Sequence, residues 1–409
     1  MRVNKWIGGM GAAFLVISAA LANDVSPQVS QPPSPLDEAI AKERANALPR
    51  TALYDTPGTL ASTQPGALLR REVGHGYTLP TGARAVRFLY HSRNAENKDV
   101  ATSGVVLVPA GTPPAGGWPV IAWAHGTSGV AQMCAPSLMK DIAYGEEGLL
   151  PMVRAGYAVV ATDYHGLGTE GTHQYLSKIA QARDIIHSIP AAQAAEPSLG
   201  RRWVVAGHSQ GGMAAWGVAE LEQAANDPTY LGAVAVAPAI IVEELAQLRE
   251  APKAVGFYFN YIAFAIHARW PGFKPSDMLT GQALARYGDV TSKGCWNYAF
   301  ASYLDDAEPV RLKDGWGQLP GAKAFFAANV MGDAKVGPML VISSDGDQSV
   351  PLEGVKRVAD SACRQGSVLA FRTYPGLDHD PLMTDSTPDQ LAWIAERFSG
   401  KPAASDCGQ

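Results

Sequence analysis

Residues 203–221 read WVVAGHSQGGMAAWGVAEL, and both a fold class and a chemistry can be predicted from them. Trp203–Ala206 is an apolar run typical of a buried strand, Gly207–Gly211 is a G-x-S-x-G pentapeptide, and Met213–Leu221 follows a helical pattern. A serine on a sharp strand-to-helix turn exposes its hydroxyl, and flanking glycines let the strand and helix approach closely. Ser209 is therefore predicted to be a nucleophile at a helix N-terminus, where free N–H groups can face an oxyanion.

The order of the histidines points to one candidate base. Of nine histidines, only His267 and His379 follow Ser209, and in α/β-hydrolases the triad runs serine, acid, histidine along the chain. His267 lies in an aromatic run with a helical pattern and precedes each candidate acid. His379 follows an apolar strand predicted at 368–374 and a Pro-Gly turn, so it is the predicted base.

The acid should lie past the preceding strand, which is predicted at 338–344 as a buried parallel strand. Two aspartates follow it, Asp345 and Asp347. Asp347 opens a D-x-x-V-P turn, the usual form of this acid, so it is the predicted one, and the other aspartate is expected to cap the turn. Asp378 and Asp380 flank the predicted base and are expected to diverge from its ring as solvated loop carboxylates.

The oxyanion formed in acyl transfer needs backbone donors from two places. One is the N–H of the residue after the nucleophile, Gln210. The other should come from the loop after the strand predicted at 119–124, at Gly126 or Thr127. His125, on the same loop, precedes the serine in the chain and is expected to orient the loop.

The N-terminus reads as a cleaved signal peptide, residues 1–22. Arg2 and Lys5 precede an apolar stretch that ends in the small-x-small sequence ALA at 20–22. The stretch is shorter than the roughly 20 residues that span a bilayer. We expect an exported chain, periplasmic or secreted, that begins near Asn23 and has no integral membrane segment. The formal net charge of −5 and the lack of a basic patch argue against nucleic acid as a partner.

Strands and helices alternate along most of the chain after an antiparallel opening at 85–90 and 103–108. This alternation predicts an α/β fold with a mostly parallel sheet flanked by helices on both faces. About 100 residues separate the strands at 233–236 and 338–342, far more than a crossover needs, so an element is inserted there. The predicted organisation begins with a poorly ordered lead-in at residues 23–56, which contains one short helix at 36–47. A first part of the core (57–239), a mainly helical inserted cap (240–335) and a second part of the core (336–409) follow.

Several motifs, in this order, resemble the secretory lipase family, in its lipase-A-like branch. They are HGTSG (125–129), CAPS (134–137), DYHGLG (163–168), GHSQG (207–211) and DQSVP (347–351). The resemblance extends from about Pro57 to the C-terminus. It implies an α/β-hydrolase with a Ser-Asp-His triad, carboxylic ester hydrolysis, and a cap inserted after the sixth strand. Asp163 and the glycines behind it read, on physical grounds, as a structural turn.

Four cysteines in an exported chain suggest two disulfides, with three possible pairings. The family resemblance favours Cys134–Cys295, which would tie the cap to the loop beside the oxyanion donors, and Cys363–Cys407, which would hold the C-terminal tail. No cluster has zinc-ligand spacing and no glycine loop has phosphate-binding form, so neither a metal nor a nucleotide cofactor is expected.

The run from Phe257 to Trp270 carries aromatic or aliphatic side chains on nearly every face. Such a helix is either ordinary core or part of an acyl pocket, and the two interpretations are compatible. The candidate substrate-binding residues of the cap are Phe257, Phe259, Tyr261 and Phe264.

These features together predict a cofactor-independent serine carboxylic ester hydrolase, a lipase or an esterase, that acts on a small-molecule or lipid ester through an acyl-enzyme. One alternative is a serine peptidase or amidase with the same triad, because the leaving group depends on the cap. The other is a binding protein on an α/β-hydrolase scaffold, which would not need nucleophile, acid and base together.

Overall fold

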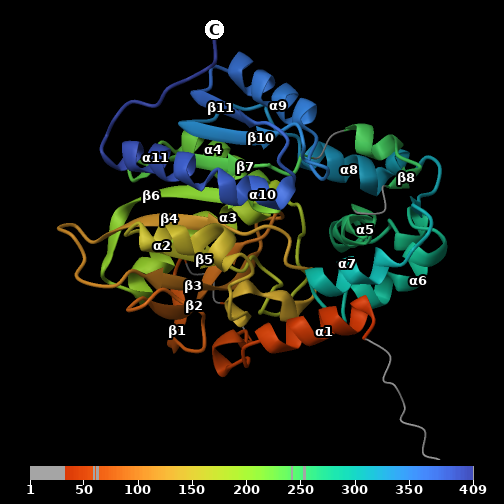
Figure 1. The fold of residues 1–409 in the computed structure, drawn as a ribbon, viewed down its shortest axis with the longest axis horizontal. Coiled ribbons are helices and arrows are strands. Elements are labelled where there is room, and N and C mark those ends of the chain that lie inside the picture. Colours follow the sequence, from red (N-terminus) through yellow and green to blue (C-terminus); the bar gives the residue numbers. More distant parts are fainter. Residues whose placement is uncertain (1–32, 59, 61–63, 241–242, 252–254, 409) are drawn as a thin grey trace, which may run out of the picture.

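The computed structural model describes residues 33–408 except 59, 61–63, 241–242 and 252–254. The predicted signal peptide lies outside the described residues. Within them, the centre is a nine-stranded sheet in the order β1-β2-β3-β5-β4-β6-β7-β10-β11 (Figure 1). The strands are β1 (Leu68–Gly74), β2 (Arg84–Arg93), β3 (Asp99–Val108), β4 (Trp118–Ala124), β5 (Ala158–Thr162), β6 (Leu199–His208), β7 (Tyr230–Val236), β10 (Met339–Ser344) and β11 (Leu369–Tyr374).

The sheet is antiparallel from β1 to β5 and parallel from β5 to β11. This confirms the predicted mostly parallel sheet with an antiparallel opening. The edge strand β1 is an addition that the sequence analysis missed, because its sequence LLRREVG holds three charged residues and is partly exposed along its length. The inserted cap therefore follows the seventh strand of the sheet.

Helices cover both faces of the sheet because the buried strands are apolar on both faces. In β4, Val120 and Ala122 join the core on one face, and Ile121 and Trp123 join the core on the other. The first face is covered by α3 (Lys178–Ala195), α4 (Gln210–Ala225) and α9 (Leu352–Arg364), and the second by α2 (Leu150–Arg154), α10 (His379–Asp385) and α11 (Thr387–Phe398).

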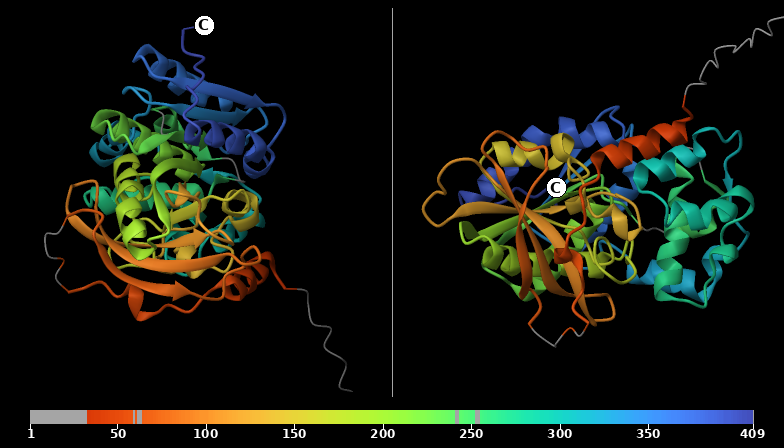
Figure 2. Two further views of the ribbon diagram at one scale, coloured as in Figure 1. Left: turned by 90° about the vertical axis from the view of Figure 1, so that its left-hand side faces the viewer. Right: turned by 90° about the horizontal axis from the view of Figure 1, so that it is seen from below.

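The lead-in is ordered from Ser34 onward, so the expectation of a poorly ordered segment is wrong for this part. Helix α1 (Pro35–Asn46) begins with a capping box between Ser34 and Asp37. Its Glu43 carboxylate accepts hydrogen bonds from the N–H groups of Cys295 (2.9 Å) and Tyr298 (2.8 Å) at the start of the cap helix α7. Helix α1 thus lies along both the core and the cap, as seen from below in Figure 2.

The cap occupies the chain between β7 and β10 and lies beside the sheet (Figure 1, right). Its helices are α5 (Tyr258–Arg269), α6 (Gly281–Val290), α7 (Trp296–Leu304) and α8 (Pro320–Ala328), and a short antiparallel pair joins β8 (Glu250–Ala251) to β9 (Val310–Arg311). The disulfide Cys134–Cys295 ties the cap to the core, and Cys363–Cys407 holds the C-terminal tail against α9. None of the described helices is long and apolar enough to cross a membrane.

Asp163, which follows β5, is fully buried and joins strand β3 to the turn at Pro136–Leu138. Its carboxylate accepts hydrogen bonds from the Ser103 hydroxyl (2.6 Å) and from both the backbone N–H (2.7 Å) and the hydroxyl of Ser137. The Tyr54 hydroxyl extends this network to the Ser137 hydroxyl at 2.7 Å. Burial raises the pKa of Asp163 to about 6. These contacts fit the structural turn that the sequence analysis expected here.

Asp163→Ala should lower the free energy of unfolding by about 3 kcal/mol or more, because buried groups of Ser103 and Ser137 lose their acceptor. Asp163→Asn keeps the shape and one acceptor oxygen, and the two hydroxyls can rotate to accept from its amide, so its loss should be smaller. Urea unfolding of the three proteins at one pH measures both effects.

The stability difference between the wild type and Asp163→Asn should also depend on pH. An aspartate in the unfolded chain titrates near 3.9, whereas the pKa of Asp163 in the fold is about 6, so the folded state binds this proton more tightly. The resulting stabilisation is complete below about pH 4 and is lost as the pH rises to about 6. The wild type should therefore lose stability relative to Asp163→Asn over that interval, and a constant difference would contradict this assignment.

Candidate active site

Ser209 lies on the sharp turn between β6 and α4. Its φ and ψ are 57° and −121°, a conformation that residues other than glycine rarely adopt. The surrounding glycines make the turn possible. A Cβ on Gly207 would overlap the backbone of Gly211, and one on Gly211 would overlap the carbonyl group of Ala124. A Cβ on Gly212 would meet the backbone after β7 at 2.7 Å. The pentapeptide therefore forms the strand-turn-helix that its sequence predicts.

Asp347 and His379 form a hydrogen-bonded pair. His379 Nδ1 lies 2.8 Å from Asp347 Oδ2, and Asp347 Oδ1 accepts from the N–H groups of Ser349 and Val350, both at 2.8 Å. The Asp347 side chain is 0% exposed and that of His379 is 10% exposed. A carboxylate held by two amides and shielded from water orients the imidazole ring and leaves Nε2 available for proton transfer.

The neighbouring aspartates of these loops have backbone partners. Asp345 Oδ1 accepts from the N–H of Gly376 at 2.6 Å, which joins the loop after β10 to the loop after β11. Asp378 Oδ1 accepts from the N–H groups of His379 (2.8 Å) and Gln348 (3.0 Å). Both aspartates brace the loops that carry the acid–histidine pair.

His208 connects the turn at Ser209 to His379. Its Nε2 donates to the backbone carbonyl of His379 at 3.1 Å, and the two ring centroids are 4.5 Å apart. Burial holds the pKa of His208 well below its usual value, so the ring is neutral. Because His208 directly precedes Ser209, this contact brings the predicted nucleophile and the predicted base to one place in the fold.

The loop after β4 lies beside this turn and is buried, including Gly126 and Thr127. His125 Nδ1 lies 2.6 Å from the carbonyl oxygen of Gly126, and His125 Nε2 lies 3.2 Å from that of Asp163. The Thr127 hydroxyl pairs with the Tyr175 hydroxyl at 2.9 Å. Burial lowers the pKa of His125 to about 4, so this ring is neutral and orients the loop, as expected from the sequence.

Gln210 is the first residue of α4, so its backbone N–H has no partner within the helix. Its side-chain amide is buried and donates to His173 Nε2 at 3.4 Å. Burial lowers the pKa of His173 to about 3, which keeps that ring neutral and able to accept. The side chain of Gln210 thus points away into the core and leaves its backbone N–H at the helix start.

Asp380 lies closer to the histidines than the sequence analysis expected. His208, His379 and Asp380 each offer one atom of a kind that binds metal ions, and these three atoms lie within 4.8 Å of one another. The three side chains could therefore hold a metal ion. Asp380 is exposed, as the sequence analysis expected of a solvated carboxylate, but it lies in the first turn of α10 and not on a loop, and it does not diverge from His379. Burial raises the pKa of Asp380, and His379 opposes this effect. A cation held there would compete with proton transfer by His379, whose Nδ1 already pairs with Asp347.

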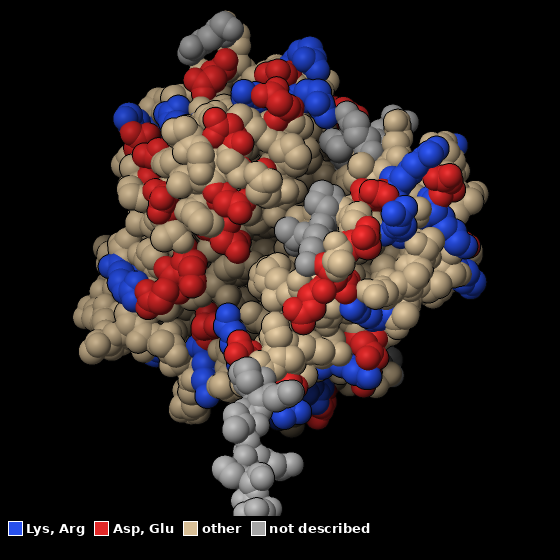
Figure 3. Space-filling view, turned by 45° about the vertical axis from the view of Figure 1, so that its right-hand side comes forward, with Lys and Arg blue, Asp and Glu red and all other residues tan. Residues whose placement is uncertain are grey.

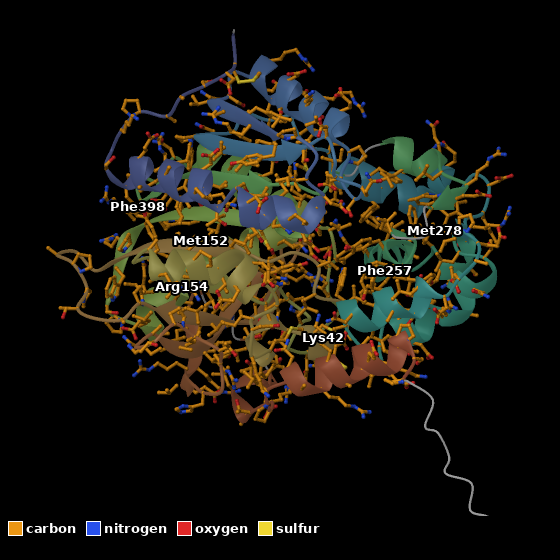
Figure 4. The ribbon with its side chains drawn as sticks, in the orientation of Figure 1. Lys42, Met152, Arg154, Phe257, Met278 and Phe398 are labelled. Carbon is orange, nitrogen blue, oxygen red and sulfur yellow. A yellow bond between two sulfur atoms is a disulfide. The ribbon has the colours of Figure 1, made fainter. Side chains whose placement is uncertain are left out.

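Three of the four predicted substrate-binding aromatics are core residues of the cap. Phe257, Phe259 and Tyr261 are 1, 4 and 0% exposed, and Phe264 is half-buried. In Figure 4, Phe257 lies on the side of the cap that faces the sheet, where the edge of its ring packs against Trp296. Of the two compatible interpretations, ordinary core describes these three residues in the structure.

Two tyrosines that the sequence analysis did not single out lie at the site. Tyr258 of the cap accepts a hydrogen bond from Trp296 Nε1 at 2.9 Å, and burial and the carboxylates of Asp380 and Asp347 raise its pKa. Tyr144 of the core packs its ring edge-on against His208, at a centroid distance of 5.9 Å. Only the tertiary packing brings these two residues to the site, so no local pattern marks them. Figure 3 shows a hollow between core and cap, with acidic side chains on its core side.

Residues 141–406, well over half of the chain, match the model of the family described as Secretory lipase. Over 379 residues the chain is 23% identical to a Mycobacterium tuberculosis protein named "Probable inactive lipase MT1628", with 85% of this chain and 82% of that protein covered.

Solved structures share the fold. Lipase A of Candida antarctica in its closed state gives a TM-score of 0.74 at 17% identity, covering 89% of this chain and 90% of that one. The rice cell wall degrading esterase LipA of Xanthomonas oryzae gives 0.67 at 19% identity, covering 82% and 98%. A putative hydrolase of Legionella pneumophila gives 0.67 at 15% identity, covering 82% and 99%. At these identities the likeness shows an α/β-hydrolase fold.

Gly211→Ala should lower the free energy of unfolding by about 3 kcal/mol, because the added Cβ overlaps the carbonyl of Ala124 and forces the backbone to move. Gly288→Ala is the matched control. It lies inside helix α6 with nothing within 4 Å of the added Cβ, so it should be neutral or stabilise by about 0.5–1 kcal/mol. Urea denaturation measures both, and equal unfolding free energies for the two variants would contradict the packing described at the turn.

Proposed function

Because this chain belongs to the secretory lipase family, we propose that it is an exported serine carboxylic ester hydrolase that uses Ser209, Asp347 and His379. The observation that carries the proposal is the buried Asp347–His379 pair, whose histidine contacts the residue before the strained serine. Nucleophile, acid and base occur along the chain as Ser209, Asp347 and His379, which is the order of the α/β-hydrolase triad.

In the proposed reaction, Ser209 Oγ attacks the ester carbonyl carbon while Nε2 of His379 takes the hydroxyl proton. His379 then gives this proton to the alcohol oxygen, the bond from that oxygen to the acyl carbon breaks, and the acyl group remains on Ser209 as an ester. A water molecule repeats the attack and releases the acid. Asp347 holds the ring by Nδ1–H and stabilises the imidazolium that forms in both steps.

Two backbone donors are proposed for the oxyanion. The N–H of Gln210 lies at the N-terminus of α4, where both the free amide and the helix dipole favour negative charge. The second donor is proposed on the loop at Gly126 or Thr127. The neutral ring of His125 can donate to one of the two carbonyl oxygens that it approaches, those of Gly126 and Asp163, and Thr127 pairs with Tyr175; these contacts support a rigid loop, as such a donor requires.

We propose a lipid or small-molecule ester as the substrate, bound in the hollow between the core and the cap. Export to the periplasm or the medium is supported by the signal-peptide pattern at 1–22 and by four cysteines paired in two disulfides, which persist in oxidising compartments.

A non-catalytic binding protein is the second candidate, because the name of the Mycobacterium tuberculosis relative describes an inactive lipase. One assay separates the candidates. The purified protein is given p-nitrophenyl esters of increasing acyl length and p-nitroanilide peptides, with and without an organophosphate. Ester cleavage that the organophosphate blocks supports the proposal. Anilide cleavage alone would support a peptidase, and no cleavage with no labelling of Ser209 would support a binding protein.

Ser209→Ala should lower kcat for ester hydrolysis by roughly 10⁴-fold or more while leaving the Tm unchanged. His379→Ala should do the same, and the double variant should be barely slower than either single one, because the two groups act in one step. Steady-state kinetics with thermal melts measures this. Losses that multiply in the double variant would show that the two residues act independently.

Asp347→Asn should reduce kcat by about 10⁴-fold, because its amide leaves the imidazole in the unproductive tautomer. Asp345→Asn is the matched control on the same turn. Its Oδ1 contact with Gly376 is remote from the ring, and an amide oxygen can keep this contact, so the loss should be far smaller. If Asp345→Asn lost its activity while Asp347→Asn remained active, the acid of the triad would be Asp345 and not Asp347.

A further inference from the structure

The phenol of Tyr144 occupies the space that a side chain at position 126 would fill. A Cβ on Gly126 would lie 3.1 Å from Tyr144 Cε2, 3.3 Å from the Tyr144 hydroxyl oxygen and 3.4 Å from the carbonyl oxygen of His208. Gly126 belongs to the loop on which the second oxyanion donor is proposed, and His208 precedes the proposed nucleophile. The phenol of Tyr144 therefore packs against the loop of Gly126, and its ring packs against His208, so it lies close to both segments that are proposed to meet the carbonyl oxygen of a substrate.

The hydroxyl of Tyr144 forms no hydrogen bond with any residue in the described part of the chain. Tyr144 is half-buried, and its hydroxyl oxygen keeps some contact with solvent. Desolvation of the packed part of the side chain, together with the carboxylate of Asp380, holds the pKa of Tyr144 well above 10. The phenol thus keeps its proton across the whole working range of an ester hydrolase and can donate it in a hydrogen bond.

The backbone before Tyr144 is strained. Ile142 and Ala143 have φ values of 56° and 68°, and positive φ is especially unfavourable for a β-branched residue such as isoleucine. Strain of this kind costs about 1–3 kcal/mol per residue and persists only where surrounding contacts hold it, often at functional sites. Ile142 and Ala143 therefore carry this strain directly before Tyr144, whose phenol packs against the loop of Gly126.

The contacts that hold the strained turn come from helix α1. Asn46 Nδ2 donates to Asp141 Oδ1 at 2.8 Å, and the N–H of Asp141 donates to Asn46 Oδ1 at 3.2 Å. Asp141 Oδ1 also accepts from the N–H of Ala143 at 3.0 Å. The amide of α1 and the carboxylate of the turn therefore fix the backbone that presents Tyr144.

From this geometry we propose that Tyr144 is a further catalytic residue, whose phenol donates a hydrogen bond to the substrate's carbonyl oxygen as negative charge develops on it. The inference rests on the proposed ester hydrolysis and adds a side-chain donor to the two backbone donors. The phenol keeps its proton throughout, so it stabilises charge and transfers nothing. Asp141 and Asn46 are positioning residues, which act only through Tyr144.

The test uses Tyr144→Phe, which removes the hydroxyl and keeps the ring against His208. Removing one oxyanion donor lowers kcat by about 10²–10³-fold, and we expect that loss with a KM within about threefold of wild type, because the contact strengthens only in the transition state. Tyr157→Phe is the matched control. Its ring packs on Phe398 in the core and its hydroxyl is remote from the site, so kcat should be unchanged.

Two further readouts separate this role from others. The pH dependence of kcat/KM should keep its shape in Tyr144→Phe, because the phenol does not titrate in the range. Asp141→Ala should lower kcat about tenfold with an intact Tyr144, and Asp141→Asn, which retains the Oδ1 acceptor, should recover most of it. This pair tests the proposal even where Tyr144→Phe is too unstable to assay.

A wild-type kcat in Tyr144→Phe, or a raised KM at unchanged kcat, would overturn the catalytic role. So would equal losses in Asp141→Ala and Asp141→Asn. Failure of the proposed function is distinguishable, because then the wild-type protein itself would neither cleave p-nitrophenyl esters nor react with an organophosphate at Ser209.

Discussion

The close approach of β6 and α4 across Ser209 is the constraint on which the rest of the structure depends. It forces a positive φ on a serine, a strain of about 1–3 kcal/mol. The backbone at the end of β7 holds the turn, since the Ser209 N–H donates to the carbonyl of Val236 at 3.0 Å and the Ser209 carbonyl accepts from the N–H of Ala239 at 2.9 Å. With the serine fixed at the carboxyl edge of a parallel sheet, the proposed acid and base come from loops that follow strands on one side of it. Asp347 follows β10, which is next to β7, and His379 follows β11, which is next to β10.

The loops of Asp347 and His379 are braced by the carboxylates of Asp345 and Asp378, and two buried histidines brace the backbone around the Ser209 turn. Burial lowers the pKa of His125 and of His208, so both rings brace backbone carbonyls as neutral groups. This matters for His379, because a neighbouring cation would oppose the imidazolium that the proposed reaction forms, and charges interact strongly in a partly buried site. Asp347 pairs with the His379 ring at 2.8 Å, and a carboxylate oxygen of Asp380 lies within 4.8 Å of a ring nitrogen, so two acidic side chains lie beside it. A neutral His208 and the acidic side chains of Asp347 and Asp380 suit a histidine that is proposed to gain a proton during each turnover.

Features with a local signature were predictable from the sequence, and features made by tertiary packing were not. The turn at Ser209 and the sheet class follow from strand, glycine and helix patterns, and the structure has both. The cap helix was also found, but a helix that is apolar all round does not show which side faces a substrate. The sequence therefore predicts Phe257 and Tyr261 as substrate-binding residues. In the structure it is the half-buried Tyr258 whose pKa is raised by the carboxylates of Asp380 and Asp347. Tyr144 follows Ile142 and Ala143, and neither residue type indicates a positive φ in the sequence.

A lipase, an esterase and a protein named inactive all match this chain, so overall similarity is compatible with an enzyme and with a binding protein. Backbone strain is more informative, since it opposes folding and needs a separate reason to persist. Two strained segments, at Ser209 and at Ile142–Ala143, approach the oxyanion loop from different parts of the chain. Strain at these two places supports the proposed ester hydrolase over a binding scaffold, because catalytic groups held in position before the substrate arrives need not reorganise during the reaction.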